Sequence, residues 1–541
     1  MKNKVKKIVA ILVLVLIMGF NCLLSACSLV TINNTKYLAQ KVVTSDNVSI
    51  NMEDLILGYN SFGYSYIETY GMTAEEAVKK TIEDLIDREL LVAYAKDKYG
   101  ELSITEQNEI YTEVYASINS QVKEYADEIV EDEGLILPEE NESEEQTNEN
   151  KVTFYEKKVE RVKNQDGSYT YSRIKEEEKP EDTNLIEFVL EEYGIEGLAT
   201  RAYSKYINAA KKSRDEYKKL TNDEVFDKEV DRIYKIFEKN KYVEKLQEDY
   251  EDNVDVDTEA ILNKYKELVR NSAFTYALNE SGYNTKMQST SNEIYYQPFG
   301  EKYIQVAHIL VKYNDEQTKQ IEKLKTDLKQ GYIDIEEYNQ QVLNISKSVK
   351  AKEYVDGSLV ETTKSVNALY NEIQSSLNAC GNDDDLRLQT FINYIEKYNE
   401  DEGMLTAINS QTQYYAVNLD TTVTDTMVKE FADASRALYS ADGSTDYTLY
   451  AEPVLTEYGY HIIFSLGTIK NEITLNNIEN VTISYLFETD AMQGTNKSLF
   501  DKMFELVESS NFEEYQSALL LNLRSNKTFK YNKTAYERLY K

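Results

Sequence analysis

Only two histidines occur in the 541 residues of the sequence, and both stand in the same kind of setting. His308 lies in Val-Ala-His-Ile-Leu-Val-Lys and His461 lies in Gly-Tyr-His-Ile-Ile-Phe, and each is followed at once by a short apolar run. Such runs are typical of strands, in which alternate side chains share a face, so His308 should lie with Leu310 and His461 with Ile463. If the two strands are neighbours in one sheet, the two imidazoles can meet on a common face.

Paired histidines can serve three kinds of chemistry. A metal site is a poor match, because neither histidine has a cysteine or carboxylate at ligand spacing, and we expect no metal and no cofactor. Activation of a nucleophile is also a poor match, because no serine or cysteine motif lies near either histidine. The sequence therefore favours partly buried imidazoles that hydrogen-bond to each other and form the floor of a small pocket.

The motifs around these histidines resemble those of the parvulin family of peptidyl-prolyl isomerases. The family opens on a strand like His308 to Lys312 and closes on one like Glu452 to Ile463. Between them it carries a loop of Tyr-Ser-Glu-Asp type, here Tyr398 to Asp401, and a Met-x-x-x-Phe step, here Met427 to Phe431. All four motifs occur in family order within residues 301–467.

The resemblance implies a site without a covalent intermediate. A prolyl amide rotates over a barrier of about 18 to 20 kcal/mol, which a site lowers by binding the twisted amide better than the planar one. His308 and His461 would form the hydrogen-bonded floor of that site, and Asp401 would face the twisting bond. The cup for the proline ring would be formed by Leu419, Met427 and Phe431, with Tyr458 at its rim. Spacing alone favours ordinary core positions for Leu419, Met427 and Phe431, and the resemblance is what points to a cup.

Two features depart from the family pattern. A Gly-Gly-Asp-Leu-Gly turn usually precedes the cup, whereas residues 413–419 read Gln-Tyr-Tyr-Ala-Val-Asn-Leu and keep only the leucine. The loss of these glycines puts turnover in doubt. The link between the first strand and the first helix, residues 313–363, is far longer than usual, and its heptad-like charged start predicts a helical arm that projects from the module.

The N-terminus reads as a leader for export. Four lysines precede an apolar run from Ile8 to Phe20, and Leu24-Ser25-Ala26-Cys27 resembles the lipobox of bacterial lipoproteins. This resemblance implies a signal peptide at residues 1–26, a lipid anchor on Cys27 at the extracytoplasmic face of the cell membrane, and a tether at 27–44. The alternatives are an ordinary signal peptide and an N-terminal membrane helix.

The remaining chain predicts an α+β protein that is mainly helical. A helical domain is expected at 45–300, with an acidic disordered and hairpin insertion at 131–182, and C-terminal helices at 468–541 should pack on it. Between them, at 301–467, we expect the inserted parvulin-like module with a small antiparallel sheet. The capping box at Thr73 and the apolar repeat up to Lys98 resemble the N-terminal helical domain of PrsA-type foldase lipoproteins and of the periplasmic chaperone SurA.

The formal net charge of -35 bears on partners. A body this acidic repels nucleic acid and suits basic or unfolded polypeptides, and the charge is equally compatible with only keeping a tethered protein soluble. The resemblances imply unfolded or partly folded exported polypeptides as partners and, through Cys27, the membrane. A homodimer is left open. The first hypothesis is a membrane-anchored peptidyl-prolyl isomerase that assists folding. The second is a holdase chaperone with a degenerate parvulin-like module, and the third is an envelope scaffold without client activity.

Overall fold

The computed structural model describes residues 35–133, 135, 159–163, 169–173, 184–191, 193, 195–287, 293–355, 358–409, 414–423, 426–493, 497–525 and 527–540. The predicted signal peptide, Cys27 with its lipobox, residues 136–158, 164–168 and 174–182 of the predicted insertion, and Gln413 all lie outside these ranges. The protein is mixed α+β, about 62% helical, with small antiparallel sheets. Within the described ranges, no helix is both long and apolar enough to cross a membrane.

The chain divides into two compact units, which we describe separately. Unit 1 comprises residues 1–144, 177–255 and 508–541, and unit 2 comprises residues 145–176 and 256–507. Helix α18 (Leu499–Ser525) has residues in both.

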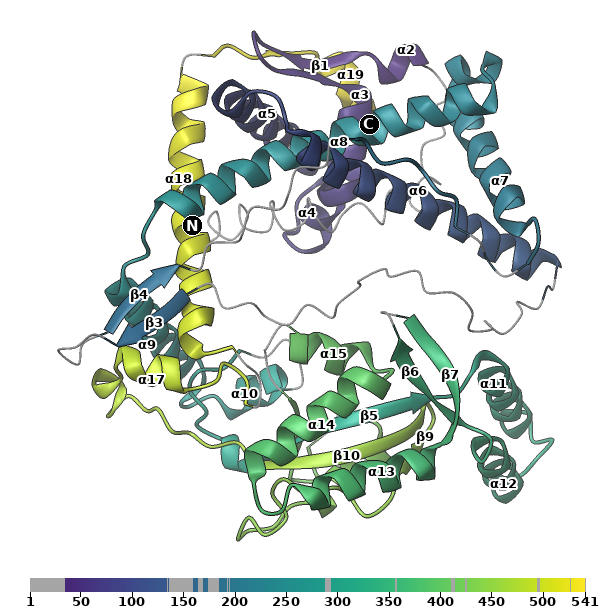
Figure 1. Ribbon diagram of the computed structural model, residues 1–541, viewed down its shortest axis with the longest axis vertical. Helices are drawn as coiled ribbons and strands as arrows, with labels where there is room; N and C mark the ends of the chain where they lie inside the picture. Colours follow the sequence, from purple (N-terminus) through teal and green to yellow (C-terminus); the bar gives the residue numbers. More distant parts are fainter. Residues whose placement is uncertain are drawn as a thin grey trace. The chain divides into compact units, whose positions relative to one another are not determined.

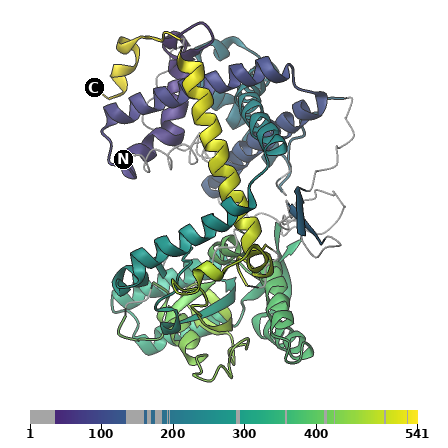
Figure 2. The same ribbon diagram turned by 90° about the vertical axis from the view of Figure 1, so that its left-hand side faces the viewer.

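Unit 1 consists of helices and one small sheet (Figures 1 and 2). Its three-stranded sheet has the order β11-β1-β2. The strands are β1 (Lys41–Thr44), β2 (Ser49–Asn51) and β11 (Lys530–Tyr531). Its helical elements are α2 (Thr35–Leu38), α3 (Met52–Gly58), η2 (Tyr59–Gly63), α4 (Tyr64–Glu68), α5 (Ala74–Tyr99), α6 (Ile104–Glu133), α7 (Leu198–Ser213), η3 (Asp215–Lys219), α8 (Asn222–Asn253), α19 (Lys533–Tyr536) and η6 (Glu537–Leu539).

Helix α5 forms where the sequence predicts it. The Thr73 hydroxyl accepts a hydrogen bond from the Glu76 N–H, and the Glu76 carboxylate accepts one from the Thr73 N–H, so the capping box is complete. The helix ends at Gly100, whose φ of 75° is a left-handed value that glycine adopts without strain. One apolar face of α5 enters the core of unit 1 through Val78, Ile82, Leu85, Ile86 and Leu90.

Residues 35–44, the described part of the predicted tether at 27–44, are folded. Residues 35–44 include α2 and β1, and Val42 and Val43 are 0% and 1% exposed. Strand β1 pairs with β2 on one side and β11 on the other, so it is the central strand of its sheet. A central strand with buried valines is part of the fold, so any tether would have to end before Thr35.

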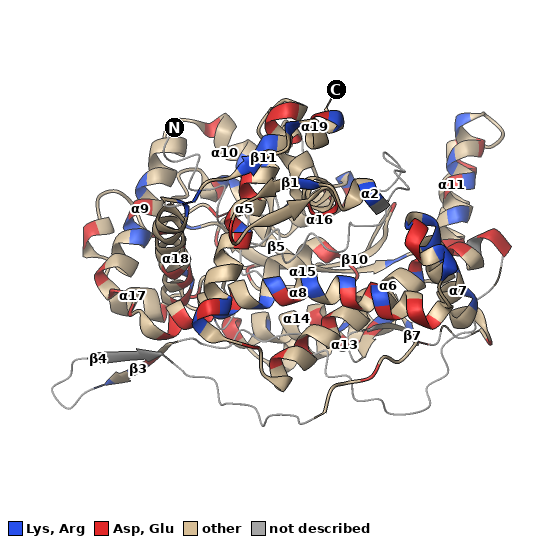
Figure 3. Cartoon of the chain, turned by 90° about the horizontal axis from the view of Figure 1, so that it is seen from above, with Lys and Arg blue, Asp and Glu red and all other residues tan. Residues whose placement is uncertain are grey.

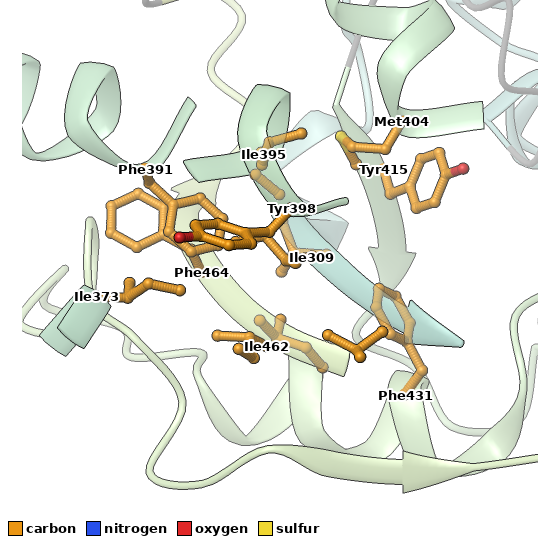
Figure 4. Packing of buried hydrophobic residues seen from close by; sticks show 14 of the residues in the cluster. Ile309, Ile373, Phe391, Ile395, Tyr398, Met404, Tyr415, Phe431, Ile462 and Phe464 are labelled. Carbon is orange, nitrogen blue, oxygen red and sulfur yellow. The ribbon is translucent and has the colours of Figure 1, made fainter. Parts of the chain in front are cut away.

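The main sheet of unit 2 has the order β8-β5-β10-β9, and every pairing in it is antiparallel. The strands are β5 (Tyr303–Lys312), β8 (Tyr415–Asn418), β9 (Val454–Thr456) and β10 (Gly459–Thr468). Helices α13 (Val366–Ala379) and α14 (Asp384–Tyr398) pack on the face that carries Ile309, with Phe391 stacked on Phe464 at 4.7 Å between ring centroids (Figure 4). The opposite face carries both histidines and contacts Phe431 of α16 (Lys429–Ala437).

The long segment 313–363 forms two helices and then a hairpin. Helices α11 (Asp315–Lys329) and α12 (Ile335–Ser346) pair with each other, and β6 (Lys350–Val355) pairs with β7 (Ser358–Ser365). The helical part was predicted, and Figure 3 shows basic and acidic residues along α11. The hairpin was not predicted. Ile321 of α11 and Ala351 of β6 are buried in the same core as the main sheet, so the base of this segment belongs to the module.

Two predicted boundaries lie elsewhere. Residues 256–300, expected in the helical domain, and residues 468–507, expected to pack on that domain, both belong to unit 2, whereas 508–541 belongs to unit 1. The cause is a shared apolar cluster of unit 2, in which Ile261, Tyr265 and Val269 pack with Leu486, Phe500 and Met503. The cluster joins α9 (Thr258–Tyr276), η5 (Ile478–Asn480), α17 (Ile483–Glu488) and the start of α18. Residues 256–300 also form α10 (Glu280–Met287) and begin η4 (Gly300–Lys302).

The predicted insertion at 131–182 also differs in part from the structure. Helix α6 continues to Glu133, inside the run expected to be disordered. Strands β3 (Val159–Lys163) and β4 (Tyr169–Arg173) form the expected antiparallel hairpin. The hairpin belongs to unit 2, where the buried Val159 joins the cluster around Ile261.

Candidate functional site

The register of β5 and β10 brings the two histidines together. His308 lies opposite Ile463, and His461 lies opposite Leu310, so the imidazoles are diagonal neighbours on one face. Their Nδ1 atoms are 3.1 Å apart, and the rings stack with 5.0 Å between centroids. His308 is 2% exposed and His461 is 6% exposed. The predicted meeting of the two imidazoles on a common face is therefore present.

A chain of hydrogen bonds runs through the pair. His308 Nε2 lies 2.8 Å from Asp401 Oδ2, and because a carboxylate only accepts, this nitrogen carries a proton. The Nδ1 atoms of His308 and His461 are joined by one hydrogen bond. The Nε2 of His461 hydrogen-bonds to the Thr456 hydroxyl, which lies 3.0 Å away. Burial lowers the pKa of His461 well below its ordinary value of 6.5, and His308 lowers it further, with Asp401 opposing. His461 is therefore neutral at physiological pH.

Asp401 is held as an anion by several donors. Its Oδ2 also accepts from the Tyr415 hydroxyl at 2.7 Å, and its Oδ1 accepts from the Gly403 N–H at 3.1 Å. Burial alone would raise the pKa of Asp401, but His308, Tyr415 and Gly403 together hold it well below its ordinary value. Burial and the neighbouring carboxylate raise the pKa of Tyr415, so its hydroxyl remains a donor.

The loop that carries Asp401 takes the place of a strand at the edge of β5. Strand β8 pairs with β5 only along residues 303–306. Beyond that point, the Asn399 side chain accepts from the Leu310 N–H at 2.8 Å, and the Glu400 N–H donates to the Leu310 carbonyl at 2.9 Å. These bonds satisfy the open edge of the strand and fix Asp401 beside His308.

The residues predicted to form a cup lie at different distances from the histidines. Phe431 is 2% exposed, and its ring lies edge-on to His308 at 5.0 Å and to His461 at 5.2 Å between centroids. Leu419 and Met427 are half-buried against the same core as Phe431. Tyr458, predicted at the rim, is 56% exposed, and its N–H donates to the Thr456 hydroxyl at 3.2 Å.

Sequence reasoning missed three residues of this site. Tyr415 lies opposite Val306, so it shares a face with His308; strand alternation could have placed it there, yet the stretch was interpreted only as a lost glycine turn. Thr456 closes the chain at His461. Gly403 leaves room for Tyr415, because a Cβ at this position would lie 2.3 Å from the tyrosine oxygen. No local signal in the sequence marks Gly403.

Among the described residues, no group of three or more histidines, cysteines or acidic residues could hold a metal ion. No protein-family model, curated protein or solved structure matches the chain.

Proposed function

We propose that the chain is a peptidyl-prolyl isomerase of parvulin type and that residues 301–467 form its catalytic module. The observation that carries this proposal is the chain Thr456–His461–His308–Asp401 packed against Phe431. It places a fixed anion beside an apolar core against which the half-buried Leu419 and Met427 pack, and side chains of this kind suit a proline ring. It contains no activated nucleophile, and rotation about a prolyl bond needs none.

The charge of Asp401 gives a physical reason for catalysis. A planar prolyl amide has a strongly negative carbonyl oxygen because of amide resonance, and the oxygen loses part of that charge when the bond twists. An anion near this oxygen destabilises the planar amide more than the twisted one, which lowers the rotation barrier. Because its pKa is low, Asp401 keeps its charge over the physiological range. The side chain is 22% exposed, so a substrate can approach it.

The histidines act by holding this anion and the apolar floor. Both nitrogens of His308 and both nitrogens of His461 have hydrogen-bond partners within the protein. They are therefore structural parts of the site and not donors to substrate. Leu419, Met427 and the edge of Phe431 would contact the proline ring.

The test is a protease-free isomerisation assay of the full chain on a short Xaa-Pro peptide. We expect Met427→Ala and Phe431→Ala to lower kcat/KM at least 10-fold. Leu343→Ala is a matched control, because this leucine is 47% exposed on α12, outside the site, and its loss should leave the rate unchanged. Equal rates for all four proteins would contradict the proposal.

We further propose that the protein works on exported polypeptides at the extracytoplasmic face of a membrane. The support is the leader and the Leu24-Ser25-Ala26-Cys27 stretch of the sequence. The test is Cys27→Ser with metabolic fatty-acid labelling. We expect the variant to lose the label and to leave the membrane fraction, and retained labelling would contradict lipidation at Cys27.

A holdase chaperone is the second candidate, and one observation favours it. The connection between α11 and α12 and the first residue of α12 expose Tyr332 and Ile335 at 74% and 56%, while Phe431 is almost fully buried. Protection of an unfolded client from aggregation would be measured by light scattering. Protection that survives Phe431→Ala but is lost in a Tyr332→Ser and Ile335→Ser double variant would support the holdase.

A further inference from the structure

The loop that carries Asp401 also contains a buried charge. The Glu400 side chain is 3% exposed, and one carboxylate oxygen, Oε1, accepts from the Lys312 N–H of β5 at 3.0 Å. The other oxygen, Oε2, accepts from Lys352 Nζ at 3.0 Å. A buried carboxylate is stable only when it is paired and hydrogen-bonded, so Lys352 is the counter-charge on which this arrangement depends.

Lys352 comes from the unusually long segment between β5 and α13. It lies on β6, next to Ala351, which is 0% exposed and packs in the core beneath the main sheet. The strand is fixed from two further directions. Glu353 pairs with Lys397 of α14 at 2.8 Å, and the Thr362 hydroxyl of β7 donates to the Ala351 carbonyl at 2.6 Å. Lys352 therefore approaches Glu400 from a rigid support.

Glu400 and Asp401 are consecutive residues, so the position of one constrains the other. Glu400 is tied to β5 through its own N–H and through Oε1, and Asp401 reaches His308 from the same stretch of backbone. If Lys352 were absent, the unpaired carboxylate of Glu400 would move toward water, and the loop would leave the edge of β5. Asp401 would then lose its alignment with His308 Nε2.

We propose that Lys352 is a positioning residue for Asp401 and that segment 313–363 builds part of the candidate site. This inference rests on the proposed isomerase function for its kinetic consequence but not for its structural one. Lys352 does not touch the reacting atoms. It acts through the charge of Glu400, which makes the position of Asp401 depend on a segment outside the four-stranded sheet.

The test uses the full chain with Lys352→Met, which keeps the apolar stem of the lysine and removes its charge. Lys350→Met is the matched control, because Lys350 lies on the same strand with its side chain exposed. Since the chain has only two histidines, the imidazole N–H signals of isotope-labelled protein report on the site directly. We expect the His308 Nε2–H signal to be lost or broadened in Lys352→Met and unchanged in Lys350→Met, with kcat reduced about 10-fold and KM changed less than twofold.

A double variant separates positioning from simple loss of structure. Adding Glu400→Gln to Lys352→Met removes the unpaired charge but keeps an amide oxygen for the Lys312 N–H. We expect it to restore the His308 signal and most of kcat. If Lys352→Met leaves the signal and kcat unchanged, or if the double variant restores neither, the inference is wrong. If the unaltered protein has no isomerase activity, the proposed function fails, while the His308 signal still decides whether Lys352 positions Asp401.

Discussion

The Nδ1 atoms of His308 and His461 lie 3.1 Å apart although the residues are 153 positions apart in the sequence. The antiparallel register of β5 and β10 makes them diagonal neighbours, and Asp401 and Thr456 bind the outer nitrogens of the pair. The only two histidines of the sequence thus belong to one chain of hydrogen bonds that runs from Asp401 to Thr456.

The buried His461 should make stability depend on pH. Its pKa is lowered in the folded state, so below pH 6.5 the unfolded chain takes up a proton that the folded chain does not. Stability should therefore fall as the pH decreases from about 6.5, by up to about 1.4 kcal/mol per pH unit, until the folded pKa is reached. His461→Gln removes this titrating group. Urea unfolding at pH 7, 6 and 5 should give a flatter dependence for the variant, and identical slopes would contradict a neutral, buried His461.

Tyr415→Phe should raise the pKa of Asp401. The substitution keeps the ring beside His308 but removes one of the donors to the carboxylate. A hydrogen bond to a charged group contributes about 1.5 to 3 kcal/mol, so the pKa of Asp401 should rise by about one unit or more. A carboxyl group whose pKa is lower in the folded state stabilises the fold above the unfolded pKa, and this stabilisation is lost as the pH falls. The variant should therefore lose this stabilisation at a higher pH than the unaltered protein. Carboxyl carbon NMR titration measures the shift, and an unchanged titration would mean that the hydroxyl does not bind Asp401.

Gly403→Ala should disturb the site through Tyr415. The added Cβ would lie 2.3 Å from the tyrosine oxygen, whereas the nearest ring carbon, Cζ, is 3.6 Å away. Overpacking of this kind costs about 1 to 3 kcal/mol. Tyr415→Phe removes the clashing oxygen. Thermal unfolding should therefore show that Gly403→Ala lowers stability much less in the Tyr415→Phe protein than in the unaltered protein. Equal costs in both backgrounds would place the strain elsewhere.

In unit 1, Arg524→Met should weaken the packing of helix α18 on helix α5. The guanidinium binds Glu83 Oε2 at 2.7 Å and the Glu83 carbonyl at 3.1 Å, and it also pairs with Asp87. The side chain of Arg524 is 29% exposed, so solvent screens part of this interaction, and we expect a loss of about 2 kcal/mol in unfolding free energy. Lys530→Met on the exposed side of β11 is the control and should change stability by less than about 0.5 kcal/mol. A similar effect of both substitutions would contradict a specific role of Arg524.

The sequence predicted those helices and strands whose formation depends on residues close together in the chain. Helix α5 was predicted from its capping box and apolar repeat, and the strands that carry His308 and His461 from their apolar runs. Strand β1 was not predicted, because a four-residue strand becomes stable only through β2 and β11, and β11 is at the far end of the chain.

The site shows the same limit. Motif order suggested Asp401 and Phe431, but Tyr415, Gly403 and Lys352 join the site only through contacts between distant segments. Periodicity indicates which face of an element is buried but not which residue lies opposite. The assignment of residues 256–300 and 468–507 to unit 2 likewise depends on a shared apolar cluster that neither segment reveals alone.

The most direct test of the proposed function is the rate of exchange between the cis and trans NMR signals of an Xaa-Pro peptide. Uncatalysed prolyl isomerisation takes about 10 to 100 s at 25 °C. We predict that the full chain, at one hundredth of the peptide concentration, makes exchange measurably faster, and that the gain saturates with peptide and is lost in Phe431→Ala. An exchange rate equal to that of the peptide alone, even at equal concentrations of protein and peptide, would contradict an isomerase.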